Sequence, residues 1–474
     1  MEQSLISQTD FATLLHLQKK TAIEWRSSTY KERLERLKIL SDWIKKNQKK
    51  IQQALWDDFR KPPIETDLSE IFPVTSEINH VAKNLKSWMS PSKVSTPLPM
   101  LGTSSYLQKE PKGTSLIISP WNYPFNLAIG PLVSALAAGC PVVIKPSEWT
   151  PHTSQLIEDM VGSLYKPEEV KVFQGDASVS QELLNLPFDH IFFTGSPQIG
   201  KIIMEKAAQH LSSVTLELGG KSPAIVTTSA NLADTARKIV FGKFVNSGQT
   251  CIAPDYILVH QDSKDQLVAE LTLAIKEMYD PKLKGIEQSP DLARLISDRH
   301  FQRLNEWLQD ALVKGAKLEF GGKADPKERY IEPTLLSGIS EEMQVAQEEI
   351  FGPILPILTY QILEQAIEYV NAKPKPLALY IFDQSKEAKE ILHKTSSGNA
   401  VINDCVLHFL NNELPFGGVN NSGLGKAHGY YGFLAFSNEK GVMKQRIGLT
   451  NVSMLRPPYG IKAKKVVQSL IKWF

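Results

Sequence analysis

Two residues of this chain could form a catalytic pair. Cys251 ends the run FVNSGQTC, and Glu217 lies 34 residues earlier (251 − 217) in the run LELGGKSP. A thiolate can attack an electrophilic carbon, and a carboxylate can activate the water that hydrolyses the resulting thioester. A lone cysteine among small residues is more often a packing residue, so the interpretation depends on its surroundings. Gly248 permits a tight turn before the thiol, and Ser247 leaves room for a substrate above it.

A third candidate lies farther upstream. Residues 114–119 (TSLIIS) have the composition of a β-strand, and the run PWNYP that follows places Asn122 on the loop at the end of that strand. A side-chain amide at such a position could donate a hydrogen bond to a developing oxyanion. Together the three residues indicate covalent catalysis through a thiol.

Six short motifs occur in a fixed order and carry a family resemblance. They are PWN (120–122), KPSE (145–148), FTGS (193–196), ELGGK (217–221), QTC (249–251) and EEIFGP (348–353). With these motifs the chain resembles the aldehyde dehydrogenase superfamily from about residue 10 to about residue 445. The short N-terminus and the run LPFGGVNNSG (414–423) look most like the class 3 branch, which acts on fatty and aromatic aldehydes.

The resemblance implies NAD(P)-dependent oxidation of aldehydes to carboxylic acids through a cysteine thiohemiacetal and thioester. Cys251 would be the nucleophile, Glu217 the base that activates water, and Asn122 an oxyanion donor together with the Cys251 backbone N–H. Medium- or long-chain aliphatic and aromatic aldehydes are the substrates expected for the branch.

The elements around these motifs predict an α/β fold. Apolar residues recur at helical spacing over residues 31–59, which predicts an amphipathic helix or a bent pair of helices. Strand-like runs at 114–119, 141–145, 170–174 and 191–194 alternate with segments of helix length. This alternation predicts a parallel sheet of Rossmann type.

The dinucleotide is expected at the carboxyl ends of these strands. A Gly-x-Gly-x-x-Gly fingerprint is absent from the sequence. Instead residues 195–200 (GSPQIG) follow a strand and open a helix, with Ser196 suited to the N-cap and Pro197 to the first helical position. A pyrophosphate could bind that helix N-terminus. The resemblance places the dinucleotide against this segment, at Gly195, Ser196 and Gly200.

Further cofactor contacts are assigned by the resemblance. Lys145 and Glu148 would bind the adenosine ribose. Glu148 can accept a hydrogen bond from a free 2′-hydroxyl and would repel a 2′-phosphate, whereas Lys145 could bind either group, so NAD is favoured and NADP remains open. The remaining expected contacts resemble those that hold the nicotinamide ribose and flank the ring; they are Trp121, Leu218, Glu349 and Phe351. Taken alone, Glu348–Glu349 would be interpreted as an exposed acidic turn.

Composition agrees with a large enzyme. A chain of 474 residues and 53.0 kDa is too long for one ordinary core, so two domains and a small appendage are expected. A net charge of +2 and the absence of a basic stripe interleaved with aromatics argue against nucleic acid as a partner. The three cysteines fit a reducing compartment. The first ten residues do not resemble a signal peptide, and no run of about 18 apolar residues occurs, so the cytosol is the expected location. The sequence contains neither a His-x-x-x-His nor a Cys-x-x-Cys spacing, so it does not predict a metal site.

The resemblance also implies how the chain is divided. Residues 1–90 and 111–216 would form the NAD-binding domain and 217–401 the catalytic domain. Residues 91–110 and 402–450 would form a small β oligomerisation arm, and a homodimer is expected. The tail, 451–474, ends in a segment with apolar residues at helical spacing beside four lysines (461–474). It could pack across a substrate entrance or lie on an anionic membrane.

Two rival functions remain at this point. The CoA-acylating branch of the same superfamily typically lacks the glutamate base, so Glu217 favours hydrolysis. A non-catalytic NAD-binding or structural relative is the second rival, and the presence of Cys251, Glu217 and Asn122 together argues against it.

Overall fold

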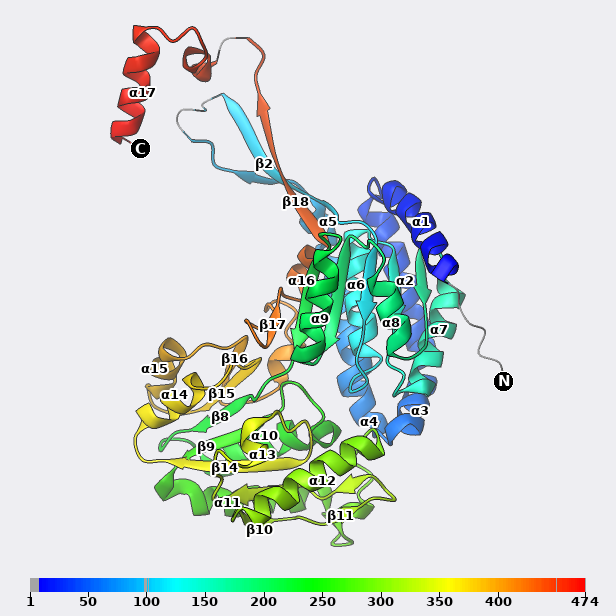
Figure 1. The fold of residues 1–474 in the computed structure, drawn as a ribbon, viewed down its shortest axis with the longest axis vertical. Helices are drawn as coiled ribbons and strands as arrows, with labels where there is room; N and C mark the ends of the chain where they lie inside the picture. The colour runs from blue at the N-terminus through cyan, green and yellow to red at the C-terminus, as the bar shows by residue number, and fades with distance from the viewer. Residues whose placement is uncertain (1–7, 98–99, 101, 449, 474) are drawn as a thin grey trace.

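Two α/β bodies and a projecting arm make up the molecule (Figure 1). The computed structural model describes residues 8–97, 100, 102–448 and 450–473. Each body is built around its own largely parallel sheet, and the arm is a three-stranded antiparallel sheet. The α/β fold with a Rossmann-type sheet that the sequence predicts is therefore confirmed.

The chain begins with helices that cover the first body. These are α1 (Gln8–Trp25), α2 (Tyr30–Lys46), α3 (Gln48–Phe59), α4 (Pro63–Thr66), the π-helix η1 (Asp67–Ile71) and α5 (Phe72–Met89). The segment expected as one helix or a bent pair is a pair, α2 and α3, which meet at Asn47. A capping box between Thr29 and Glu32 starts α2. The periodic apolar residues of the pair, among them Leu37, Leu40 and Ile51, are buried in the core of this body.

The sheet of the first body has six strands in the order β17-β7-β6-β3-β4-β5. Its parallel strands are β3 (Ser115–Ile118), β4 (Val142–Lys145), β5 (Val170–Val172), β6 (His190–Gly195) and β7 (Ser213–Leu218), and the short β17 (Gly423–Leu424) pairs antiparallel to β7. The four strands expected from the sequence are β3 to β6. The crossover helices are α6 (Asn126–Ala138), α7 (Pro151–Leu164), α8 (Ala177–Leu184) and α9 (Pro197–Ala208).

The second body holds a seven-stranded sheet in the order β10-β13-β14-β9-β8-β15-β16. Its strands are β8 (Pro223–Val226), β9 (Tyr256–His260), β10 (Lys317–Phe320), β13 (Thr334–Ser337), β14 (Ile354–Tyr360), β15 (Ala378–Phe382) and β16 (Asn399–Ile402). All neighbours pair in parallel except β10 and β13. The helices that cover it are α10 (Leu232–Phe244), α11 (Lys264–Tyr279), α12 (Asp298–Val313), α13 (Gln344–Gln347), α14 (Leu363–Asn371) and α15 (Glu387–Lys394).

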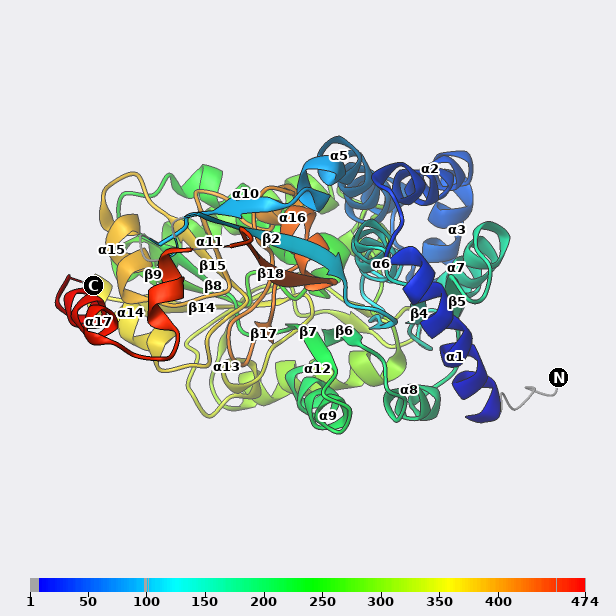
Figure 2. The ribbon, with the colours of Figure 1, turned by 90° about the horizontal axis from the view of Figure 1, so that it is seen from above.

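The arm consists of β1 (Ser92–Val94), β2 (Thr103–Pro111) and β18 (Ser437–Gln445). It extends away from both bodies and leads to the 3₁₀ turn η7 (Asn451–Leu455) and the terminal helix α17 (Ile461–Trp473) (Figure 1). Seen from above, β2 and β18 lie side by side, and α17 is on the far side of the molecule from α1 (Figure 2). No helix in the described part of the chain has both the length and the apolar character to cross a bilayer.

The stretch between β16 and β18 was expected in the arm, but much of it packs on the first body. Helix α16 (Gly429–Ala435) contacts α5 and α6, and β17 pairs with β7. The reason is apolar burial, because Phe433 of α16 is 1% exposed in the core of that body. Of the expected C-terminal part of the arm, β18 lies in the arm sheet.

Candidate active site

One cavity of about 490 Å³ is lined by both expected catalytic residues, Cys251 and Glu217. Its walls come from the first body at α4, η1, α5 and α6, and from the second body at the ends of α10 and α11. The loop 406–416 completes the wall. Most of the lining is apolar, so charged groups in it are poorly solvated.

The nucleophile loop follows directly from the end of α10. Asn246 and Ser247 have left-handed backbones (φ +55° and +52°), and Gly248 continues the turn at φ +75°. A Cβ on Gly248 would lie 2.3 Å from the Gly352 carbonyl oxygen, so only glycine fits this close approach. The tight turn predicted before the thiol is present, and it directs Cys251 into the cavity.

The thiol of Cys251 is half-buried at the cavity wall. Burial raises its pKa to about 12, and the carboxyl groups of Glu349 and Glu217 add to the rise. A thiol in this environment is protonated at neutral pH and must lose its proton before it can attack a carbonyl.

Glu217 lies on β7, where alternation along the strand sets its direction. Its neighbour Leu218 joins the apolar cluster on the other face, beneath α9, while Glu217 lines the cavity. Both carboxyl oxygens of Glu217 are buried without a hydrogen-bond partner. Burial raises the pKa of Glu217 well above its usual range, an effect that Lys426 opposes in part. An unpartnered carboxyl in the same cavity as the thiol suits a base that activates water.

Asn122 is buried beside the nucleophile loop but is not among the residues that line the cavity. Its Nδ2 donates to the Gln249 carbonyl oxygen at 3.0 Å, and its own carbonyl oxygen accepts from Asn246 Nδ2 at 2.8 Å. A side-chain amide carries two N–H groups, so one remains for a substrate oxyanion. The structure brings Asn122 to the nucleophile segment, and its oxyanion role remains a prediction.

The helix expected to bind the pyrophosphate begins as the sequence predicts. Ser196 is the N-cap of α9, its Oγ accepting from the Ile199 N–H at 3.4 Å, and Pro197 is the first helical residue. Gly200 is buried against Leu218, and a Cβ there would lie 2.8 Å from Leu218 Cδ2. Gly195, at the end of β6, pairs with Leu218. This close packing leaves the N-terminal N–H groups of α9 at the strand ends, an arrangement that fits a pyrophosphate.

Lys145 and Glu148 lie together at the carboxyl end of β4. The Lys145 ammonium is 3.2 Å from Glu148 Oε2 and donates to the Pro146 carbonyl oxygen at 2.8 Å. Burial lowers the pKa of Lys145 from its ordinary value. A donor and an acceptor side by side at this edge of the sheet fit the two hydroxyls of an adenosine ribose.

Of the residues expected at the nicotinamide, Leu218 is buried in the cluster beneath α9, while Trp121 and Phe351 are in contact. Trp121 packs edge-to-face on Phe351 with ring centroids 5.3 Å apart. Glu349 is half-buried, and burial together with Asp255 raises its pKa to about 8, while the Gly220 N–H and Lys221 oppose the rise. Taken alone, the pair Glu348–Glu349 suggested an exposed acidic turn. In the structure only Glu348 is exposed.

Sequence reasoning missed most of the cavity wall and the groups behind Asn122. The mouth carries exposed apolar side chains from two stretches of the chain: Ile64, Leu68 and Phe72 from the first, and Leu407 and Leu410 from the second. Behind Asn122 lies a fully buried ion pair, Lys61–Glu70. Neither feature has a short sequence motif, because each depends on contacts between distant segments. Among the described residues, no group of three or more His, Cys, Asp or Glu side chains could hold a metal ion.

Comparisons with known proteins agree with this geometry. The aldehyde dehydrogenase family model matches residues 2–442. The chain is 44% identical to the 4,4′-diaponeurosporen-aldehyde dehydrogenase of Staphylococcus aureus, over 92% of this chain and 93% of that protein. It is 42% identical to a probable coniferyl aldehyde dehydrogenase of Pseudomonas aeruginosa, over 93% and 91%.

Solved structures give the same result. The substrate-bound state of Staphylococcus aureus AldH superposes with a TM-score of 0.92 at 41% identity, covering 97% of this chain and 99% of that one. A Mycobacterium tuberculosis aldehyde dehydrogenase complexed with NAD⁺ gives 0.84 at 26% identity, over 94% and 92%. The chain belongs to the aldehyde dehydrogenase family and is an oxidoreductase that acts on aldehydes with NAD(P).

Proposed function

We propose that the protein oxidises apolar aldehydes, medium- or long-chain aliphatic or aromatic, to carboxylic acids through a thioester on Cys251. The observation that carries the proposal is the shared cavity, in which Cys251 and Glu217 meet between apolar walls. The thiolate attacks the aldehyde carbon and forms a thiohemiacetal. The Asn122 side-chain N–H and the Cys251 backbone N–H stabilise its oxyanion.

The later steps depend on the cofactor and on Glu217. Glu349, Phe351 and Trp121 would hold a bound nicotinamide, which would supply the acceptor for the hydride lost from the thiohemiacetal carbon. Glu217 then removes a proton from a water molecule, which attacks the thioester carbon. The C–S bond breaks, the carboxylic acid leaves and the thiol is regenerated. Glu148, next to Lys145, favours NAD over NADP.

The substrate class is inferred from the mouth of the cavity. Exposed Ile64, Leu68 and Phe72 on one side and Leu407 and Leu410 on the other can cover an apolar chain. Burial of each methylene contributes about 0.8 kcal/mol, roughly fourfold in affinity. The names of the Staphylococcus and Pseudomonas relatives specify a diaponeurosporen-aldehyde and coniferyl aldehyde, which are also largely apolar.

The test is NADH formation at 340 nm with aldehydes from acetaldehyde through decanal and hexadecanal to benzaldehyde. We expect kcat/KM to rise with chain length until the cavity is filled, and to vanish in Cys251→Ser. Cys405→Ser is the matched control, because Cys405 is buried in the second body and does not line the cavity. Full turnover in Cys251→Ser would refute the nucleophile. Equal kcat/KM for acetaldehyde and hexadecanal would refute the apolar substrate class.

The hydrolytic step has its own test. In Glu217→Gln the first turnover should proceed as an NADH burst and stop at the thioester, which adds the acyl mass to the intact protein. A steady-state rate equal to wild type would remove Glu217 from the mechanism. Thioester release by added CoA, with none by water in the wild-type enzyme, would indicate the CoA-acylating chemistry instead.

The roles of the larger parts follow from the same proposal. The six-stranded body would bind the dinucleotide, the seven-stranded body would present the thiol, and the arm would join two copies into a homodimer. Exposed Ile461, Val467 and Ile471 share α17 with exposed lysines, so this helix could attach a cytosolic dimer to an anionic membrane. Sedimentation analysis and vesicle flotation, each repeated without residues 456–474, test these two assignments.

A further inference from the structure

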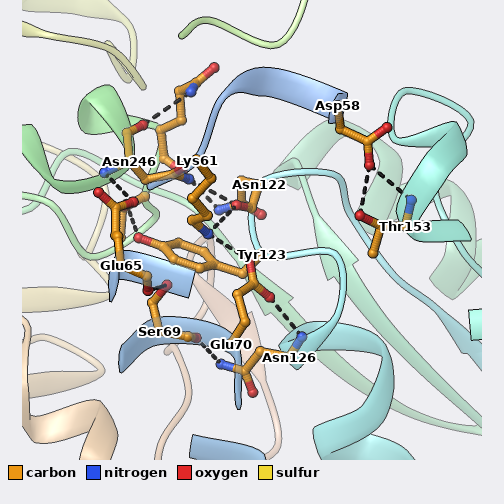
Figure 3. A network of polar contacts seen from close by, with 12 residues as sticks. Asp58, Lys61, Glu65, Ser69, Glu70, Asn122, Tyr123, Asn126, Thr153 and Asn246 are labelled. Carbon is orange, nitrogen blue, oxygen red and sulfur yellow. Dashed lines mark hydrogen bonds and ion pairs between the residues drawn. The ribbon is translucent and has the colours of Figure 1, made fainter. Parts of the chain in front are cut away.

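A short segment before α5, residues 61–70, contacts both loops that carry the expected catalytic groups (Figure 3). Lys61 begins it and is completely buried. Its ammonium is 2.5 Å from Glu70 Oε1 and 3.4 Å from the Asn122 carbonyl oxygen, and it lies 3.8 Å from the centroid of the Tyr123 ring. A buried ammonium with these partners constrains the position of the loop above it.

Glu70 extends the contact to the other end of that loop. Its Oε2 accepts from the backbone N–H of Asn126, the first residue of α6, at 2.9 Å. Asn126 Nδ2 in turn donates to the Ser69 carbonyl oxygen at 3.0 Å. A carboxylate at a helix N-terminus is electrostatically favourable there. The loop 122–126 is therefore held at both ends by residues 61–70.

The nucleophile loop joins the same network. Glu65 Oε1 accepts from the Asn246 N–H at 2.9 Å. The side-chain amide of Asn246 then donates to the carbonyl oxygens of Asn122 and Gln249, at 2.8 and 3.2 Å. Glu70 itself lies in the π-helix η1, a helical irregularity that is frequent at functional sites.

Lys61 and Glu70 do not reach the substrate space. The cavity is lined by their neighbours Pro62, Glu65 and Ser69, while both members of the pair are fully buried behind it. Any effect of the pair on the reaction must therefore pass through the loops that it holds.

We propose that the buried Lys61–Glu70 ion pair positions the oxyanion donor Asn122, by fixing its carbonyl oxygen on one side and the start of α6 on the other. The inference rests on the proposed function, because it assigns Asn122 to the oxyanion. The pair is a positioning device and makes no contact with substrate or cofactor.

Glu70→Gln is the central test. Glutamine has nearly the same shape and keeps an acceptor for the Asn126 N–H, but it removes the charge that pairs with Lys61. We expect kcat for aldehyde oxidation to fall about 10- to 100-fold, with the Kd for NAD and the KM for aldehyde changed less than about threefold. The pre-steady-state NADH burst should slow by the same factor, since oxyanion stabilisation precedes hydride loss.

A double-mutant cycle with Asn122→Ala separates positioning from general structural damage. Loss of one oxyanion donor typically costs about 10²- to 10³-fold in kcat. If the ion pair acts through Asn122, adding Glu70→Gln to Asn122→Ala should cause no further loss. Losses that multiply would overturn the proposal, as would an unchanged kcat in Glu70→Gln alone.

Two further variants keep the result interpretable. Asp383→Asn is the matched control, because Asp383 is a buried carboxylate just after β15. It lies at the opposite end of this strand from Leu377, which lines the cavity. This substitution should lower Tm and leave kcat of the folded enzyme near wild type. If Glu70→Gln does not fold, Lys61→Met/Glu70→Gln removes both charges at once and should fold with the same loss of kcat. Wild-type kcat in that double variant would also overturn the proposal. An inactive wild-type enzyme would instead count against the proposed function.

Discussion

The resting state of Cys251 offers the sharpest quantitative prediction. The pKa of its thiol rises from an ordinary 9.0 to about 12, a difference of three units. At 1.36 kcal/mol per unit this corresponds to about 4 kcal/mol against the thiolate. At pH 8 the thiolate fraction is then about 10⁻⁴, compared with about 10⁻¹ for a thiol of pKa 9.0.

The assay is alkylation by iodoacetamide in the absence of cofactor, followed by peptide mass mapping. Cys140 and Cys405 are 0% exposed, so labelling reports on Cys251, and Cys251→Ser supplies the blank. Since only the thiolate reacts, we expect the rate constant to keep rising from pH 7 to pH 10, about tenfold per pH unit except near pH 8, where ionisation of Glu349 makes the rise less steep.

Glu349→Gln tests the cause of the shift. The Glu349 carboxylate is the largest charge contribution to the raised thiol pKa, and its own pKa is about 8. Below pH 8 the wild-type carboxyl is mostly protonated, and the two proteins should react alike. Above pH 8 the variant should react faster because the repelling charge is gone. A plateau below pH 10 in the wild type, or identical rates for both proteins at pH 10, would refute this account of the site.

Three further predictions follow from the cofactor side and from the cavity wall. In Gly200→Ala the new Cβ would lie 2.8 Å from Leu218 Cδ2, so either the Leu218 side chain or α9 must shift. We expect the Kd for NAD, measured by calorimetry, to rise several-fold, and an unchanged Kd would count against pyrophosphate binding at the N-terminus of α9. In Glu148→Gln the repulsion of a 2′-phosphate is lost while Lys145 remains; the ratio of kcat/KM for NADP to that for NAD should rise about tenfold, and a constant ratio would remove Glu148 from cofactor choice. Glu77 is 6% exposed, and burial raises its pKa from 4.5 to about 7, a shift of 2.5 units (7 − 4.5). Its contribution to the free energy of unfolding is therefore fully present below pH 4.5 and is lost as pH rises through 7. The loss is at most about 3 kcal/mol. Urea midpoints measured at pH 5 and pH 8 should therefore fall more in wild type than in Glu77→Gln, and parallel falls would contradict the assignment.

Local patterns predicted those parts of the molecule that depend on neighbours in sequence. The four strand-like runs correspond to β3 to β6, and the helix start at Ser196–Pro197 is an N-cap followed by a first-turn proline. The turn before Cys251 followed from the small residues Ser247 and Gly248. In each case a few adjacent residues determine the backbone conformation, so a single sequence is sufficient.

Contacts between segments that are distant in sequence could not be predicted from the sequence. Lys61 lies in a stretch without a recognisable motif, yet its function depends on Asn122, 61 residues away. The packing of α16 on α5 and α6 could not be predicted for the same reason, and the whole of residues 402–450 was therefore expected in the arm. The apolar mouth is similar, since Ile64 and Leu410 are far apart in sequence and line the same cavity only in the folded chain. Periodicity identifies a buried face but not the partner that buries it.

The pairing of β2 with β18 also determines when this protein can finish folding. Thr103 pairs with Gln445 and Pro111 with Ser437, so the two strands are separated by more than 320 residues. At a synthesis rate of about 5–20 residues per second, β2 waits roughly 20 to 70 s on the ribosome for its partner. The first body waits similarly for β17 and α16, which complete its sheet edge and its core. A nascent chain therefore keeps an unpaired strand edge and an open apolar face until almost its last residues emerge. Premature termination near residue 430 should accordingly yield an aggregation-prone fragment and not a smaller working enzyme.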